Sequence, residues 1–304
     1  MISLISLPIL LLTALLFPVP TGTDFGSTDT GRQSERRTSQ IRRDLDRISG
    51  DQLISGNRNG GDPERHFREA GVTGSFLLCE LEGDSCLRVN PDRCAKRFIP
   101  ASTFKILNSL IALQEGAVKG LDDTIRWDGK KRSVESWNQD QCMRDAFQRS
   151  CVWYYQELAR RIGEKKMKAA VNAVGYGNAD ISGGIDRFWL DGALRISSEE
   201  QAAFLRKLWK ETLPFSPEVQ RTVKDLMLLE KTDDYTIRGK TGTAIRSEIM
   251  IGWLVGFLER GDKVYIYALN VEAPDNGDMS GFWSLRLPLV KAMLRDEGLI
   301  QAQE

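Results

Sequence analysis

Beyond residue 66, the hydrophobic and polar positions predict strands at both ends of the chain and helices between them. Residues 73–80 and 85–90 form two apolar runs around a short polar stretch, which predicts an antiparallel hairpin. Residues 250–258 and 263–271 are rich in strand-forming side chains. Glu259-Arg260-Gly261-Asp262 separates these two runs as the turn of a second hairpin.

Between the two hairpins, apolar residues recur with the period of a helix. Helices are predicted over residues 102–114, 152–162 and 164–173, up to Trp209, and from Ser216-Pro217, with a last helix over residues 284–297 after the second hairpin. Ser197 and Glu200 form a capping box at the start of the helix that ends at Trp209. Strands at both ends of a helical middle predict an α/β layer with an inserted helical region, the two meeting at a cleft.

The first 66 residues differ from the rest in composition. Residues 1–17 are almost wholly apolar, but the run is too short, and too broken by Pro8 and Pro18, for a membrane span of about twenty residues. It predicts a signal peptide over residues 1–21, although no Lys or Arg precedes the apolar stretch. Residues 22–66 are rich in Gly, Ser, Asn, Asp and Arg, and predict a disordered linker before a folded domain over residues 67–304.

A short amphipathic helix is the alternative for part of the linker, because Ile41, Leu45 and Ile48 stand at helical spacing. The whole chain has 304 residues, of which 41% are hydrophobic, and this allows a sizeable core in one or two domains. Its 42 Lys and Arg balance its 42 Asp and Glu. This balance gives no support to a nucleic-acid partner or to binding at an anionic membrane surface, and no stable membrane insertion is expected.

The cysteines bear on whether the protein resides in an oxidising compartment. Cys79 and Cys86 stand symmetrically about Glu82-Gly83, so the first hairpin places them opposite each other, at a separation that a disulfide can bridge. A disulfide there indicates an oxidising compartment, and two free thiols are the alternative. The remaining cysteines, Cys94, Cys142 and Cys151, do not have metal-ligand spacing with histidine, and no metal site is predicted.

A serine and a lysine in one tetrapeptide are the first sign of chemistry. The only histidine, His66, lies outside the predicted folded domain, so a serine nucleophile would need another base. In Ser102-Thr103-Phe104-Lys105 the serine and the lysine are three residues apart, which places both on nearly the same face of a helix. Taken alone, such a tetrapeptide is more often ordinary helix surface.

A second motif, Lys240-Thr241-Gly242, precedes the run over residues 250–258. The lysine supplies a charge, the threonine a hydroxyl, and the glycine lets a substrate backbone come close, which suits a ligand that carries a carboxylate. A turn at the end of a strand is the structural alternative. Ser-x-x-Lys and Lys-Thr-Gly together are typical of the serine enzymes that recognise penicillin.

Three further segments lie between these motifs: Ser150-Cys151-Val152, Tyr176-Gly177-Asn178 and Phe188-Trp189-Leu190-Asp191-Gly192. In this order and at about these separations, the five segments resemble those of the class D, or oxacillinase-type, β-lactamases, over about residues 70–300. The resemblance implies a penicillin-binding, serine β-lactamase-like fold. In that fold an antiparallel sheet is flanked by helices, and the active site lies between the sheet and an all-helical region.

The resemblance also implies roles for the residues of the motifs. Ser102 would attack the lactam carbonyl, and Lys105 would be the base in the form of a carbamate made with carbon dioxide, with no other cofactor. Burial among Phe104, Val152 and Trp189 would favour this form, because it lowers the pKa of the lysine. Trp189 would donate its indole N–H to the carbamate, or would only pack in the core.

The remaining roles concern the leaving group and the substrate. Ser150 would pass a proton to the lactam nitrogen under the influence of Lys240, or would cap the helix at residue 152. The backbone N–H groups of Ser102 and Thr243 would form the oxyanion hole. The last group is expected to bind the substrate carboxylate and to line its site: Thr241, Gly242, Thr243 and Arg286. Arg286 could instead be an exposed helix arginine, and Tyr176-Gly177-Asn178 would shape the cleft.

The sequence thus predicts an exported enzyme, periplasmic or secreted, that hydrolyses β-lactams, penicillins above all, and confers antibiotic resistance as a monomer or homodimer. Residues 243–248 match no pattern of substrate preference in the family, which leaves carbapenems open. A β-lactam sensor that stays acylated is the second hypothesis, but such receptors carry several membrane helices. A cell-wall transpeptidase is the third, and it would not need Trp189 or an apolar pocket around the lysine.

Overall fold

A computed structural model describes residues 62–83, 85–246, 249–274 and 280–301. The predicted signal peptide and almost all of the predicted linker, with its alternative helix, lie outside these residues. The described part contains a six-stranded antiparallel sheet in the order β2-β1-β8-β7-β6-β5. Its strands are β1 (Thr73–Glu80), β2 (Cys86–Val89), β5 (Leu228–Lys231), β6 (Thr236–Arg246), β7 (Ile249–Arg260) and β8 (Lys263–Pro274).

Both predicted hairpins are confirmed. Strands β1 and β2 pair with Cys79 opposite Cys86, and these two residues form the predicted disulfide. Strands β7 and β8 are longer than predicted, and only Gly261 and Asp262 separate them. The predicted turn at Glu259 and Arg260 is therefore wrong, because both residues continue the ladder of β7.

Strand β6 is the main difference from the prediction, because Lys240-Thr241-Gly242 lies inside this strand and not in a turn at its end. The strand pairs with β7 along its whole length, whereas β5 pairs with it only as far as Arg238. Beyond Gly239, whose N–H is bonded to the Met227 carbonyl, β6 is the edge of the sheet. Alternate backbone groups of an edge strand are free to meet a ligand.

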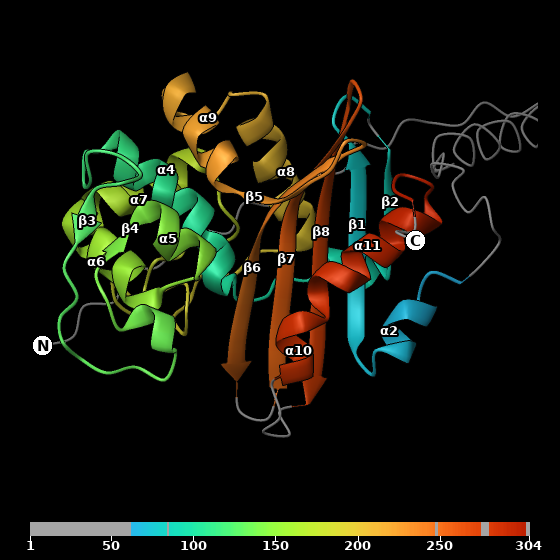
Figure 1. Ribbon diagram of the computed structural model, residues 1–304, viewed down its shortest axis with the longest axis horizontal. Coiled ribbons are helices and arrows are strands. Elements are labelled where there is room, and N and C mark those ends of the chain that lie inside the picture. The colour runs from blue at the N-terminus through green and yellow to red at the C-terminus, as the bar shows by residue number, and fades with distance from the viewer. Residues whose placement is uncertain (1–61, 84, 247–248, 275–279, 302–304) are drawn as a thin grey trace, which may run out of the picture. The chain divides into compact units, whose positions relative to one another are not determined.

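Helices form a separate region beside the β5–β6 edge of the sheet (Figure 1). The region and its connections comprise the 3₁₀ helices Ala101–Phe104 and Glu135–Trp137, the short strands β3 (Thr124–Ile125) and β4 (Gln141–Cys142), and the helices α4 (Lys105–Gln114), α5 (Met143–Gln148), α6 (Val152–Ile162), α7 (Glu164–Val174) and α9 (Pro217–Leu226). The segment between the helices predicted over residues 102–114 and 152–162 therefore contains the β3–β4 ladder and α5. The architecture of an antiparallel sheet with a helical region confirms the predicted fold class.

The remaining helices cover the two faces of the sheet. They are α2 (Arg65–Glu69), α3 (Pro91–Ala95), α8 (Ser198–Trp209), α10 (Ser280–Ser284) and α11 (Arg286–Asp296). Helix α8 has the predicted capping box, in which Ser197 Oγ accepts from the Glu200 N–H and the Glu200 carboxylate accepts from the Ser197 N–H. The predicted last helix is interrupted at Leu285, between α10 and α11.

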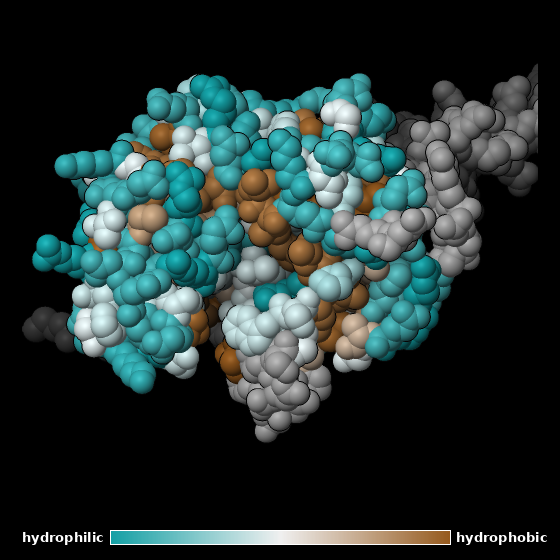
Figure 2. All heavy atoms as spheres, viewed as in Figure 1, coloured by the Kyte–Doolittle hydropathy of each residue, from teal (hydrophilic) through white to brown (hydrophobic). Residues whose placement is uncertain are grey.

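Two hydrophobic cores lie on opposite faces of the sheet, because successive side chains of a strand point to opposite faces. On β7, Trp253 joins the core shared with α8 and the helical region, whereas Leu254 joins the core shared with α2 and α11. On the face seen in Figure 2, hydrophilic side chains dominate and hydrophobic ones gather near the middle. No helix of the described residues is long and apolar enough to cross a bilayer.

His66 does not lie outside the folded domain as predicted. It belongs to α2, and its Nε2 is 2.7 Å from Asp296 Oδ2 of α11. Arg65 forms an ion pair with the same carboxylate, and Phe67 is buried in the second core. The folded part therefore begins before the predicted boundary at residue 67, although the histidine belongs to a helix on the face opposite the helical region.

Candidate active site

The serine and the lysine of the tetrapeptide are brought together at the junction of the 3₁₀ helix and α4. Ser102 lies in the 3₁₀ turn and Lys105 is the first residue of α4, and Lys105 Nζ donates a hydrogen bond of 2.7 Å to Ser102 Oγ. Ala101, directly before the serine, has a φ of 48°. A positive φ in a residue with a side chain is strained, and such strain is common where a catalytic group must be held in place.

Lys105 is fully buried, and this changes its acidity. Desolvation lowers the pKa of its amine from 10.5 to about 7, because burial disfavours the ammonium form. The Tyr155 ring lies 5.3 Å from Lys105 Nζ, a neighbour that the sequence motifs did not point to. At neutral pH a large share of this lysine is therefore a neutral amine, which can accept a proton.

Trp189 is also fully buried, and its ring stacks on Phe104 with 5.4 Å between the ring centroids. Its indole N–H has no hydrogen-bond partner among the described residues. An unpaired buried donor is unfavourable by about 1–3 kcal/mol, and this one is available to a further acceptor. Val152 is half-buried and lines the same cleft as Ser102.

Ser150 and Lys240 form a second contact between the helical region and the sheet. Lys240 Nζ, on β6, donates to Ser150 Oγ at 3.1 Å and also contacts the hydroxyl and carbonyl of Thr241. Burial, with the nearby charges of Lys105 and Arg286, holds the pKa of Lys240 well below its ordinary value. Ser150 does not cap α6: the N-cap is Cys151, so that alternative is wrong.

Gly242 permits β6 to lie against the turn that carries Ser102. A Cβ atom at this position would be 2.8 Å from the Pro100 carbonyl oxygen and 3.2 Å from the Thr103 nitrogen, so a side chain does not fit. The glycine was predicted to admit a substrate backbone. In the structure it admits the backbone of the protein itself, which sets the distance between β6 and Ser102.

Arg286 is 3% exposed, so the alternative of an exposed helix arginine is wrong. Its Nη1 donates to the Gly242 carbonyl and to Thr243 Oγ1, both at 2.8 Å. The guanidinium group thus contacts the hydroxyl of Thr243, whereas the sequence grouped Arg286 with Thr241. Burial lowers the pKa of Arg286 to about 10, which leaves it charged at neutral pH.

These residues meet at a cleft of about 470 Å³ between β6 and the helical region. One wall comes from the strand side, with Thr241, Gly242, Thr243 and Trp283. The other wall comes from the helical region and its loops, with Ser102, Val134, Trp137, Gln148, Arg149, Ser150, Val152 and Leu190. Six of the predicted site residues therefore line one cleft: Ser102, Ser150, Val152, Thr241, Gly242 and Thr243. The cleft that the strand and helix pattern predicted is present.

Tyr176-Gly177-Asn178 supports the segment of Trp189 from behind. The Tyr176 ring packs edge-on against Phe104, with 5.6 Å between centroids. Asn178 Nδ2 donates to the Ala193 carbonyl, and Asn178 Oδ1 accepts from the Arg195 N–H. This motif therefore holds the loop that carries Trp189 and shapes the cleft only indirectly.

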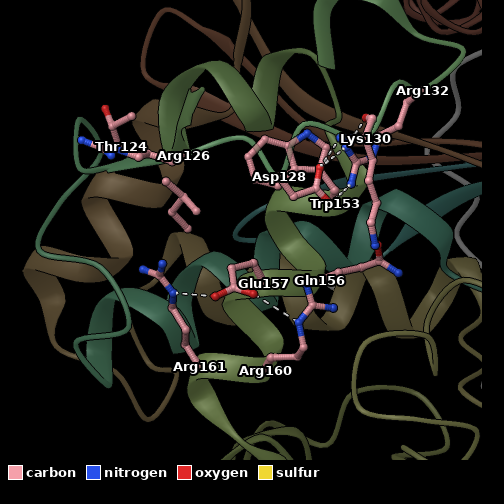
Figure 3. A pocket seen from close by; sticks show the side chains of 11 residues that line it. Thr124, Arg126, Asp128, Lys130, Arg132, Trp153, Gln156, Glu157, Arg160 and Arg161 are labelled. Atoms are coloured by element: carbon pink, nitrogen blue, oxygen red, sulfur yellow. Dashed lines mark hydrogen bonds and ion pairs between the residues drawn. The ribbon is translucent and has the colours of Figure 1, made fainter. Parts of the chain in front are cut away.

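A second hollow of about 550 Å³ lies between residues 124–132 and one face of α6 (Figure 3). Most of its charged side chains are paired with each other, as in Arg132 with Asp128 and Arg161 with Glu157. None of the residues that line it belongs to the predicted motifs. Among the described residues, moreover, no group of three or more His, Cys, Asp or Glu could hold a metal ion.

Comparison with known proteins relates this site to one family. Residues 46–291 match the penicillin binding protein transpeptidase domain. The chain is 47% identical to the probable β-lactamase YbxI of Bacillus subtilis over 66% of its own length and 74% of that protein. It is 43% identical to the β-lactamase OXA-48 of Klebsiella pneumoniae, over 77% of its own length and 87% of that protein.

A solved structure agrees with these sequence relatives. The class D β-lactamase YbXI from Nostoc superposes with a TM-score of 0.75 at 40% identity, covering 78% of this chain and 99% of that one. The relatives of this chain are thus β-lactamases. The chain itself pairs Ser102 with Lys105 and has a cleft between these residues and the Lys-Thr-Gly strand. The protein belongs to the class D β-lactamases, a family with the penicillin binding protein transpeptidase domain.

Proposed function

We propose that this protein hydrolyses β-lactams through an acyl-enzyme on Ser102. The contact of 2.7 Å between Ser102 Oγ and the buried Lys105 Nζ carries the proposal, because it joins a nucleophile to a base whose pKa is near neutrality. The membership of the chain in the class D β-lactamases supports the same reaction. Penicillins are the expected substrates.

In acylation, Ser102 Oγ would bond to the lactam carbonyl carbon as its proton passes to the base at Lys105. The ring C–N bond would then break, and the nitrogen would take a proton through the Ser150 hydroxyl, which would receive the proton held at Lys105 as it gives up its own. Lys240 Nζ contacts this hydroxyl at 3.1 Å. The backbone N–H groups of Ser102 and Thr243 would bind the oxyanion; removal of one such donor commonly raises the barrier by about 3 kcal/mol. Water would later hydrolyse the ester and restore Ser102.

Lys105 is suited to become a carbamate by adding carbon dioxide, since only the neutral amine reacts and its pKa is about 7. The unpaired indole N–H of Trp189 is a donor for such a group. The carbamate would supply an anionic base in an apolar pocket. Without a partner, a charge buried there would be strongly unfavourable, which gives Trp189 a function beyond packing.

The strand side of the cleft would bind the substrate carboxylate. Arg286 keeps its charge behind the Thr243 hydroxyl, and the Thr241 hydroxyl lines the same wall. A hydroxyl backed by a buried cation is a favourable site for an anion. The helical side of the cleft, with Val134 and Leu190, would hold the apolar part of the acyl side chain.

Export is part of the proposal, with the protein in the periplasm or secreted and acting in antibiotic resistance. The disulfide between Cys79 and Cys86 supports it, because disulfides persist mainly in oxidising compartments.

Steady-state hydrolysis of a penicillin by the full chain, with and without bicarbonate at mildly acidic pH, tests the function. We expect turnover that bicarbonate increases, and at least a thousandfold loss of kcat/KM in Lys105→Ala, of the order found when a nucleophile loses its base. Lys130→Ala is the matched control, because Lys130 is exposed and lines the second hollow. Stoichiometric acylation without turnover would instead indicate a sensor or a transpeptidase.

NMR with isotope-labelled bicarbonate tests the modification without reference to activity. A carbamate signal in the wild type that is absent from Lys105→Ala supports the modified lysine. The same signal in both proteins, or in neither, would leave Lys105 as an unmodified amine base.

A further inference from the structure

The mouth of the cleft carries an exposed indole. Trp283 of α10 is 52% exposed and lines the cleft together with Thr241 and Thr243. It is the only aromatic residue among the large hydrophobic side chains that are exposed in the described part of the chain. Tryptophan presents a large rigid surface at little cost in conformational entropy, which is why it is frequent in binding sites.

The backbone holds this indole in a fixed place. The preceding residue, Phe282, is 5% exposed and packs on Gly252 of β7, where a Cβ atom would lie 2.9 Å from its ring. The carbonyl of Trp283 itself accepts a hydrogen bond of 3.0 Å from Arg286 Nη2. Trp283 is therefore exposed on a short helix whose backbone is anchored by Phe282 and by Arg286, and this places the indole at the mouth of the cleft.

Trp283 stands beside the residues proposed to bind the carboxylate. The guanidinium carbon of Arg286 lies 5.7 Å from the centroid of the Trp283 ring. In a bicyclic β-lactam the carboxylate is borne by one ring carbon, and the substituent of the neighbouring carbon lies a few bond lengths away. A carboxylate bound at Thr243 and Arg286 therefore brings that substituent within reach of the indole.

We infer that Trp283 selects β-lactams with a flat, uncharged aromatic group on the ring carbon next to the one that bears the carboxylate. This inference rests on the proposed function. An aromatic group can stack on the exposed part of the indole. A cationic group is disfavoured, because the charge of Arg286 is close to the same ring.

The experiment uses two cephalosporins with the same thienylacetamido side chain. One carries an arylvinyl group beside the carboxylate-bearing carbon, and the other carries an acetoxymethyl group there. We expect Trp283→Ala to lower kcat/KM for the arylvinyl compound about threefold to tenfold more than for the acetoxymethyl compound. Trp283→Phe, which keeps an aromatic ring, should restore most of the preference, with KM carrying most of the change.

Val134→Ala is the matched control. Val134 is also exposed, at 39%, but lies on the opposite wall of the cleft, so this variant should leave the ratio of the two kcat/KM values within about twofold of the wild type. Equal effects of Trp283→Ala on both compounds, no effect on either, or an equal shift of the ratio in Val134→Ala would overturn the inference while leaving hydrolysis intact. A wild type that hydrolyses a penicillin but neither of these compounds would also overturn the inference, whereas a wild type that hydrolyses none of the three would overturn the proposed function itself.

Discussion

The indole N–H of Trp189 is buried and has no partner in the part of the chain that the structure describes, so its removal should affect stability and activity differently. Trp189→Phe keeps a ring on Phe104 and removes the unpaired N–H. We expect the melting temperature in bicarbonate-free buffer to change little, because the loss of the unfavourable N–H burial offsets the cavity that the smaller ring leaves. Deacylation should slow about tenfold or more, since a hydrogen bond to a buried anion contributes about 1.5–3 kcal/mol. Thermal unfolding and single-turnover kinetics measure both effects, and unchanged deacylation would contradict the role of Trp189.

Lys105 links the stability of the protein to pH. Its pKa falls from 10.5 to about 7 on folding, so between these values the unfolded chain binds a proton that the folded chain lacks. The stability contributed by this group therefore rises with pH across that window. Relative to Lys105→Met, the wild type should gain roughly 1.4 kcal/mol per pH unit between about pH 7 and pH 9. Denaturant unfolding in bicarbonate-free buffer checks this, and a difference that is constant with pH would refute it.

At the scale of single residues, the sequence indicated which residues belong to the site better than it indicated the contacts and burial of those residues. Ser102 and Lys105 were found because both belong to one local turn, whose geometry depends only on nearby residues. For Arg286 the sequence left burial and exposure open, because its burial depends on β6, more than forty positions earlier in the chain. Tyr155 was missed for the same reason: its ring reaches Lys105 only once α6 packs on α4.

Among the elements, β6 connects the sheet to the proposed active site, and Gly242 of this strand packs against the turn that carries Ser102. Gly242→Ala would place a Cβ atom 2.8 Å from the Pro100 oxygen and push the strand away from Ser102. We expect a loss of about 1–3 kcal/mol of stability and a clear fall in kcat/KM. Gly120→Ala is the control, because nothing lies within 4 Å of a Cβ atom there and its φ is not positive. Equal effects of the two substitutions on activity would contradict this role for Gly242.

The sequence predicted elements well where local signals mark their ends. The capping box at Ser197 and the proline of Ser216-Pro217 gave the starts of α8 and α9. Strand β6 was not predicted because its sequence includes Gly239 and Gly242, which are unfavourable in strands. Both glycines are there because other groups come too close for a side chain, the Tyr267 hydroxyl at Gly239 and the Pro100 carbonyl at Gly242. Such approaches are tertiary and cannot be read from a local pattern.

For the whole molecule, the two cores on opposite faces of the sheet have different connections to the site. The pattern of strands around helices predicted the sheet, the helical region and the cleft, but not the docking of α2 on the second core. Phe67 of α2 packs in that core, beneath β1 at Gly74. Phe204 of α8 belongs to the first core, where its ring contacts Tyr176 at 5.2 Å between centroids. From Tyr176 the contacts continue through Phe104 to Trp189.

Phe67 and Phe204 form a matched pair, since both are phenylalanines and both are 4% exposed. Replacement by alanine at either position leaves a cavity of similar origin, and we expect each variant to lose about 3–5 kcal/mol of stability. Only Phe204→Ala should also lower kcat, because its cavity lies behind the ring that supports Phe104 and the lysine pocket. Phe67→Ala should keep the wild-type kcat well below its melting temperature, since α2 contacts α11 at Asp296, at the opposite end of that helix from Arg286. Denaturant unfolding and steady-state kinetics on both variants measure this difference; equal losses of kcat would mean that the sheet transmits disorder from either core to the cleft.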